Sequence, residues 1–102
     1  MPASTWLDLC RAAEGQQNFE RAVEEYDKLA QAYPKERQSV LALMAAGRLS
    51  QTKLNRPAEA LRFYKAAAAS SVPHIDWEMN IQGGIREAEK TLSATEAPAA
   101  RS

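Results

Sequence analysis

The stretch KLNRPAEALRFYKAA, residues 53–67, decides the fold of this chain. A turn begins at Asn55. Pro57 follows at a position where the first turn of a helix tolerates proline, because the missing N–H would be unpaired there anyway. Small and apolar residues then recur at the three-to-four spacing of an amphipathic helix. The stretch therefore predicts a helical hairpin, with one helix over 36–54 and a second over 57–70.

The sequence before this hairpin predicts another of the same kind. A first helix is expected over 5–16, capped by Thr5, and a second over 19–32, capped by Asn18 and stopped by Pro34. Each of the four helices carries an apolar stripe that we expect to be buried. In chain order these stripes are Trp6, Leu9, Cys10 and Ala13; Phe19, Ala22, Val23, Tyr26, Leu29 and Ala30; Val40, Leu43, Met44, Gly47 and Leu54; and Ala60, Leu61, Phe63 or Tyr64, and Ala67.

A fifth helix is expected over 75–92, after a break that ends at a proline. Gly83 and Gly84 interrupt its apolar period, so the helix either kinks there or lets a neighbouring helix approach closely. We favour close packing, because the period continues across the glycines. Residues 93–102 are small and polar, which predicts a disordered tail behind a folded domain over 1–92. The apolar period of the fifth helix consists of Trp77, Ile81, Ile85, Ala88 and Leu92.

The order of residue types repeats between the two hairpins. It is carried by Trp6, Leu9, Cys10, Phe19, Ala22, Tyr26 and Pro34 in the first, and by Ala60, Tyr64, Ala67 and Pro73 in the second. This order resembles the tetratricopeptide repeat, in which tryptophan, leucine and a small residue precede an aromatic-glutamate-alanine start to the second helix, a later aromatic and a closing proline. The resemblance implies an all-α fold: a right-handed stack of antiparallel helical hairpins, with two such repeats and a C-terminal capping helix.

The small residues have a physical role in this fold, because helices cross closely only where side chains are small. We expect Cys10 to pack against Ala22 and Gly47 against Ala60. The interval from Ala22 to Ala60 is 38 residues, where the family repeats about every 34. One extra helical turn, or a longer loop around residues 34–38, is therefore implied. With fewer than three repeats, the fifth helix must cap the stack, or neighbouring copies or further sequence must supply the remaining contacts.

The resemblance also implies a function: binding a peptide or helix of a partner protein on a concave face built from the first, third and fifth helices. On the third helix a second stripe lies away from the core, and flanking basic groups beside an apolar floor suit an amphipathic helix or an extended peptide. The corresponding positions do not match the basic-asparagine clamp with which some relatives hold a C-terminal carboxylate. The expected partner-binding residues are Leu7, Arg11 and Glu14; Leu41, Ala45, Leu49 and Thr52; and Met79, Gln82 and Arg86.

Two alternatives stay open for this surface. Leu41 and Leu49 could instead only pack against the neighbouring helices. The domain could also serve structurally, as a homodimerisation domain using the fifth helix or the second stripe, or as a regulatory appendage of a larger, possibly membrane-attached, protein.

Charge excludes some partners and suggests others. The chain has 13 basic and 13 acidic residues, so no global field attracts it to nucleic acid or to an anionic membrane. Residues 35–72 are basic between two acidic flanks. This pattern indicates either solvated helix faces with ion pairs between helices, or an acidic ligand that lies across the middle helices.

No residue pattern predicts catalysis, a metal or another cofactor. His74 and Asp76 stand together without the third and fourth ligands that a zinc site needs. Cys10 falls on the buried face of the first helix, where thiols are inert. A single cysteine, no secretion signal and no apolar run of about 20 residues predict a protein of the cytoplasm without a membrane-spanning segment.

Overall fold

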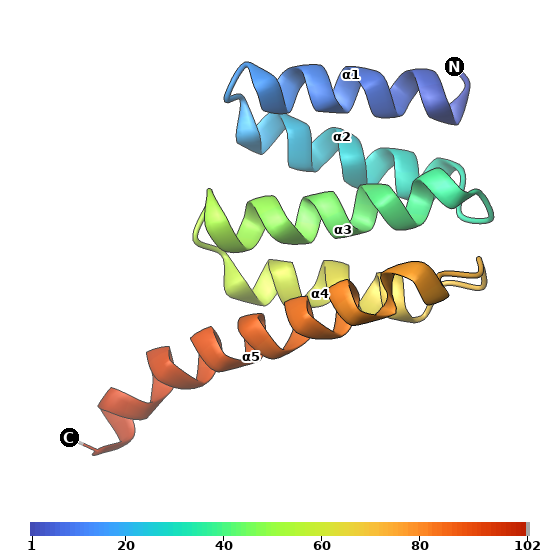
Figure 1. The fold of residues 1–102 in the computed structure, drawn as a ribbon. Coiled ribbons are helices and arrows are strands. Elements are labelled where there is room, and N and C mark those ends of the chain that lie inside the picture. Colours follow the sequence, from blue (N-terminus) through green and yellow to red (C-terminus); the bar gives the residue numbers. More distant parts are fainter. Residues whose placement is uncertain (102) are drawn as a thin grey trace.

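The computed structural model describes the backbone of residues 1–101 and the side chains of residues 1–94. Over that range the chain forms five α-helices and one short 3₁₀ helix, and no strand. The first four helices lie side by side in chain order, and α5 crosses α4 at the end of the stack (Figure 1). The expected all-α stack of five helices is confirmed. The elements are α1 (Ala3–Gly15), α2 (Phe19–Ala32), α3 (Arg37–Thr52), α4 (Pro57–Ala68), η1 (Ile75–Trp77) and α5 (Glu78–Arg101).

The ends of the first four helices agree with the sequence patterns to within a few residues, but the predicted caps of α1 and α2 do not form. α1 begins two residues before Thr5, so the prediction that Thr5 caps it is wrong. Pro2 precedes the helix instead, and its carbonyl accepts the N–H of Trp6 at 3.0 Å. Asn18 does stand at the N-cap of α2, yet its side chain makes no capping hydrogen bond. Both helices thus begin without the side-chain cap that the sequence predicted.

The two hairpin turns share one backbone feature. Gln17 and Asn55 adopt positive φ angles of 63° and 53°, and each stands two residues before the second helix of its hairpin. Asparagine tolerates this left-handed conformation better than most residues. α3 has 16 residues against 13 in α1, so most of the excess length of the repeat interval comes from about one additional helical turn in α3.

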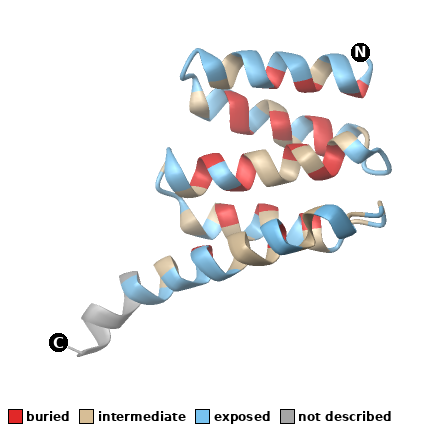
Figure 2. Cartoon of the chain, in the orientation of Figure 1, coloured by how far each residue is buried: buried red, intermediate tan, exposed pale blue. Residues whose placement is uncertain are grey.

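The core follows the line along which the helices meet (Figure 2). Ala22 and Ala60 are fully buried, and the expected stripe of α2 is buried except for Phe19, which is half-buried. In α1 the prediction was wrong for Leu9, which is 54% exposed, whereas Leu7 is 6% exposed and joins the core. The face of α1 is thus rotated from the expected one, because the helix packs against α3 as well as α2.

α3 is buried on more sides than its stripe predicted, since it contacts α1, α2, α4 and α5. A helix in the middle of a stack has no fully solvated face, so its sequence is apolar over a wider arc than an edge helix requires. Besides Val40 and Gly47, the buried residues of α3 are Ser39, Ala42, Ala46, Leu49 and Ser50.

The glycines of α5 act differently from each other. A Cβ on Gly84 would lie 2.4 Å from the ring of Tyr64 in α4, which confirms the expected close packing at this glycine. A Cβ on Gly83 would meet only the end of the Arg86 side chain, at 3.9 Å. Gly47 was expected against Ala60, but the same Tyr64 ring lies over it.

α5 does not end at Leu92, as the sequence predicted. Ser93 and Ala94 continue the helix as exposed residues, because neither breaks helical geometry and alanine favours it. The rest of the expected disordered tail falls on residues 95–102, which lie outside the fully described part of the chain. None of the described helices has both the length and the apolar character that crossing a membrane requires.

Candidate functional site

A cleft of about 590 Å³ lies between α1 and α3, and the turn that joins α1 to α2 closes one end of it. We call it the α1–α3 cleft. Its lining combines two buried residues, Leu7 and Tyr26, with the exposed side chains of Arg11, Arg48 and Lys53. The lining residues are Leu7, Arg11, Glu14, Gly15, Gln17, Phe19, Tyr26, Leu41, Ala45, Arg48 and Lys53.

Five of the ten residues that the sequence proposed for partner binding meet in this cleft. On α1, positions separated by three or four residues share a face, because successive residues are rotated by about 100°. The same rule brings two residues of α3 to the facing wall. The five are Leu7, Arg11, Glu14, Leu41 and Ala45.

Leu49 does not belong to this surface. It is fully buried in the core that α3 shares with α1 and α2, so a partner cannot contact it. Leu49 is two steps of four residues after Leu41, so its side chain is rotated by about 80° from that of Leu41, away from the cleft. Arg48 lies within about 20° of Leu41 and lines the cleft instead. The residue spacing alone could have identified Arg48 as part of the stripe.

A smaller cleft of about 280 Å³ adjoins the first on the other side of the α3 ridge, and we call it the α3–α5 cleft. Leu41, Ala45 and Arg48 line both clefts, so α1, α3 and α5 border one continuous surface. From α5, Asn80 contributes, and Tyr64 of α4 reaches in between the helices.

The residues expected from α5 lie elsewhere. Met79 is 86% exposed and Arg86 is exposed, whereas Gln82 is half-buried and donates to Glu78 at 3.1 Å; none of the three lines either cleft. Met79 and Arg86 occupy the side of α5 away from buried Ile81, rotated from it by about 160° and about 140°, and Gln82 lies at the flank, about 100° from it. Thr52 is also absent from the lining, and its hydroxyl donates to the carbonyl of Arg48 at 2.8 Å.

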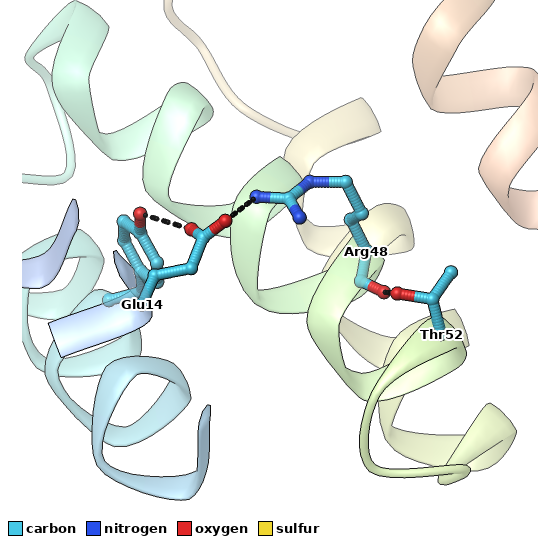
Figure 3. Close-up of polar contacts among 4 residues, drawn as sticks. Glu14, Arg48 and Thr52 are labelled. Atoms are coloured by element: carbon cyan, nitrogen blue, oxygen red, sulfur yellow. Dashed lines mark hydrogen bonds and ion pairs between the residues drawn. The ribbon is translucent and has the colours of Figure 1, made fainter. Parts of the chain in front are cut away.

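Glu14 joins the two walls of the α1–α3 cleft (Figure 3). Its Oε1 accepts a hydrogen bond from the Tyr26 hydroxyl at 3.0 Å, and its Oε2 accepts one from Nη2 of Arg48 at 2.8 Å. Burial, followed by the hydrogen bond to Glu14, raises the pKa of Tyr26, so this phenol stays protonated as a donor. The carboxylate thereby fixes the position of Arg48 at the edge of the cleft.

Another cation lines the cleft at the α1–α2 turn. Lys53 follows α3 and places its Nζ 5.6 Å from the centre of the Phe19 ring. Neither residue was among those proposed from the sequence, because Phe19 was assigned to the core stripe of α2 and Lys53 to the end of a helix. The α1–α2 turn brings this aromatic ring toward the end of α3, and that proximity is a tertiary feature.

The basic middle of the sequence pairs with its acidic beginning. Arg48 pairs with Glu14, and Arg56 pairs with Glu20, so both ion pairs connect elements of the first hairpin to elements of the second. All four side chains are at least partly exposed, so each pair contributes little to stability.

The residues with other chemical potential lie outside the cleft. Cys10 is fully buried, and burial, followed by the charge of Glu25, raises its pKa to about 11, so the thiol is protonated at neutral pH. His74 contacts the carbonyl of Val72 at 2.7 Å and Glu78 at 3.2 Å, which ties the segment before η1 to α5. Among the described side chains, no group of three or more potential metal ligands is found.

Comparison of the chain with protein-family models, with curated proteins and with solved structures gave no match.

Proposed function

We propose that this chain is a protein-interaction module that binds a peptide segment of a partner protein in the α1–α3 cleft. The observation that carries the proposal is the cleft itself. Five of the partner-binding residues expected from the sequence line one hollow, and two of them, Leu41 and Ala45, lie on the α3 ridge that borders it. Concave sites with an apolar floor and a few placed polar groups are the usual form of binding sites.

The size of the surface suits a peptide. The α1–α3 and α3–α5 clefts share a ridge and have volumes of about 590 and 280 Å³. A helix or an extended segment laid across α3 would contact both hollows, with side chains entering on either side of Ala45.

We also propose that the fold is of the tetratricopeptide type. Each hairpin turn has a residue of positive φ two positions before the second helix, and Ala22 and Ala60, each the fourth residue of that helix, are fully buried. In such stacks the first helix of each hairpin contributes to one face, which is the arrangement that places α1 beside α3.

A role without catalysis fits the same observations. The buried, protonated Cys10 is a poor nucleophile, and it belongs to α1 whereas His74 precedes η1. A nucleophile and its base must lie within hydrogen-bond reach of each other. The Nδ1 atom of His74 instead contacts the carbonyl oxygen of Val72.

Self-association is the second candidate function, and one observation favours it. Ile75 and Met79 are each 86% exposed at the start of α5, which leaves two large apolar side chains in solvent at the end of the stack. Covering them with a second copy of the chain would bury that apolar area. Light scattering over a range of protein concentrations separates the two functions, since a stable dimer mass that disappears on Met79→Glu would support self-association through α5.

Selection from a random peptide library tests the main proposal. Phage displaying 12-residue peptides are panned against the purified chain, and enriched peptides are then tested against Ala45→Arg, which places a long charged side chain on the α3 ridge between the two clefts. The matched control is Ala66→Arg, which makes the same change at an exposed position of α4. Far-UV circular dichroism checks that both variants keep the helical content of the parent chain.

We expect enriched peptides that bind the parent and Ala66→Arg alike and that lose binding to Ala45→Arg. Failure to enrich any peptide, or peptides that bind Ala45→Arg as well as the parent, would contradict the proposed cleft.

A further inference from the structure

The charges around the α1–α3 cleft are unequal. Three cations, Arg11, Arg48 and Lys53, line it with a single carboxylate, Glu14. That carboxylate is already engaged by the Tyr26 hydroxyl and by Arg48. The unpaired charge that a ligand meets in this cleft is therefore positive.

Two of the cations retain donors for a ligand. Arg11 is exposed and has no ion-pair partner among the described side chains. Arg48 contacts Glu14 through Nη2, and a guanidinium carries five N–H groups, so donors remain on the side of Arg48 that does not face Glu14 (Figure 3). The Arg48 side chain is 48% exposed, which leaves it within reach of a bound peptide.

Glu14 holds Arg48 in place before any ligand arrives. The carboxylate is itself fixed by the largely buried Tyr26, so the guanidinium is positioned by a chain of two hydrogen bonds that begins in the core. Fixing a side chain in advance lowers the entropy that binding must remove from it. An arginine positioned in this way is suited to carboxylate oxygens, which accept parallel N–H donors.

A second hollow, between α2 and α4, has the opposite net charge. The hollow between α2 and α4 is lined by four carboxylates, from Glu20, Glu24, Asp27 and Glu59, and by two arginines. The two hollows therefore differ in the sign of their net charge, and the cationic one is the α1–α3 cleft. Complementary charge favours correct partners and raises their association rate.

We infer that the peptide bound in the α1–α3 cleft is acidic: an amphipathic segment whose apolar side chains cover Leu41 and Ala45 while its carboxylates pair with Arg48 and Arg11. This inference rests on the proposed function and adds the chemical class of the partner. Lys53 extends the cationic edge toward the α1–α2 turn, so successive acidic residues of one peptide have partners along the cleft.

The test uses the peptide most enriched by the phage selection, synthesised with a fluorescein label, and measures its Kd by fluorescence anisotropy. Arg11→Gln, Arg48→Gln and the double variant each remove cleft charge. Lys65→Gln makes the same charge change at an exposed position of α4 that lines neither cleft. A second peptide carries Gln and Asn in place of its Glu and Asp residues.

We expect the selected peptides to be rich in Asp and Glu. Kd should rise about threefold for each single variant and about tenfold for the double variant, as exposed charge pairs allow, and stay unchanged for Lys65→Gln. The neutralised peptide should bind at least about tenfold more weakly, and raising the salt from about 50 to about 300 mM should weaken the acidic peptide more than the neutral one.

Three results would overturn the inference, and they differ in what they leave standing. Neutral or basic peptides that Ala45→Arg still blocks would show that the cleft binds peptides of another class, so the proposed function would stand. No enriched peptide at all would reject both proposals. A homodimer that Ala45→Arg dissociates would show that a second copy of the chain occupies the cleft.

Discussion

The ring of Tyr64 occupies the space that a Cβ on Gly84 would need. The nearest ring carbons would lie 2.4–2.6 Å from that Cβ, and the ring carbons nearest to a Cβ on Gly47 would lie 2.8–3.0 Å from it. One aromatic side chain of α4 therefore packs against two glycines, one in α3 and one in α5. The position of α5 on the stack depends on both glycines lacking a side chain.

Gly84→Ala should destabilise the fold, although alanine is the better helix former. The added methyl overlaps a ring that already packs closely against Gly47, so α5 must shift, at a cost of about 1–3 kcal/mol in the free energy of unfolding. Gly83→Ala is the matched control, because its methyl meets only the end of Arg86, and it should stabilise by about 0.5–1 kcal/mol. Urea unfolding followed by circular dichroism measures both.

Repeating the Gly84→Ala change in a Tyr64→Leu chain tests whether the Tyr64 ring causes the destabilisation. In a Tyr64→Leu chain the smaller side chain leaves room beside α5, so Gly84→Ala should cost less there than in the parent chain. Equal costs in the two backgrounds would mean that Tyr64 is not what Gly84 accommodates.

Truncating Leu49 and Leu9 should have effects opposite to those expected from the sequence, which placed Leu49 on the binding surface and Leu9 in the core. Leu49→Ala should lower the free energy of unfolding by about 2–5 kcal/mol, because it leaves a cavity at a fully buried site. Leu9→Ala, at a residue that is 54% exposed, should change it by no more than about 0.5 kcal/mol. If chemical denaturation gave similar losses for the two, the rotation of α1 described above would be wrong.

The Cys10 thiol should be unreactive in the folded chain. It is fully buried and its pKa is raised to about 11, so at pH 8 both access and thiolate content are low. Ellman's reagent should react slowly with the native protein and release one equivalent promptly in denaturing urea. Stoichiometric labelling within seconds under native conditions would contradict the burial of this residue.

Stability should fall at alkaline pH. The pKa of Cys10 is raised from 9.0 to about 11, and that of Tyr26 is also raised above its ordinary value of 10, so both groups hold their protons more tightly in the folded state. Their contribution is complete below pH about 9 and is lost as pH rises, because the unfolded chain releases these protons first. The free energy of unfolding between pH 8 and pH 11 should therefore decline less steeply for Cys10→Ala, and less steeply for Tyr26→Phe, than for the parent.

At neutral pH, Tyr26→Phe should itself cost about 1–2 kcal/mol, since it removes a hydrogen bond to a charged acceptor while keeping the ring in the core. An unchanged free energy of unfolding at pH 7 would indicate that the hydrogen bond to Glu14 contributes nothing to stability.

The helices were largely predictable from the sequence because their signals are local. α2 was predicted with its observed ends, since a stripe from Ala22 to Ala30 and the stop at Pro34 need no other part of the chain to be recognised. The end of α5 was predicted too early, because small polar residues after Leu92 do not stop a helix as a proline or glycine turn does. Thr5 does not cap α1, because the helix begins earlier, at Ala3.

The sequence by itself determined the number of helices, their pairing into hairpins and half of the cleft, because periodicity and punctuation are properties of neighbouring residues. Only the tertiary structure decided which side of each helix faces which neighbour. That choice depends on contacts between distant residues, such as Tyr64 with Gly84 or Glu14 with Arg48, and a rotation of less than one quarter-turn about α3 moves Leu49 into the core and Arg48 into the cleft.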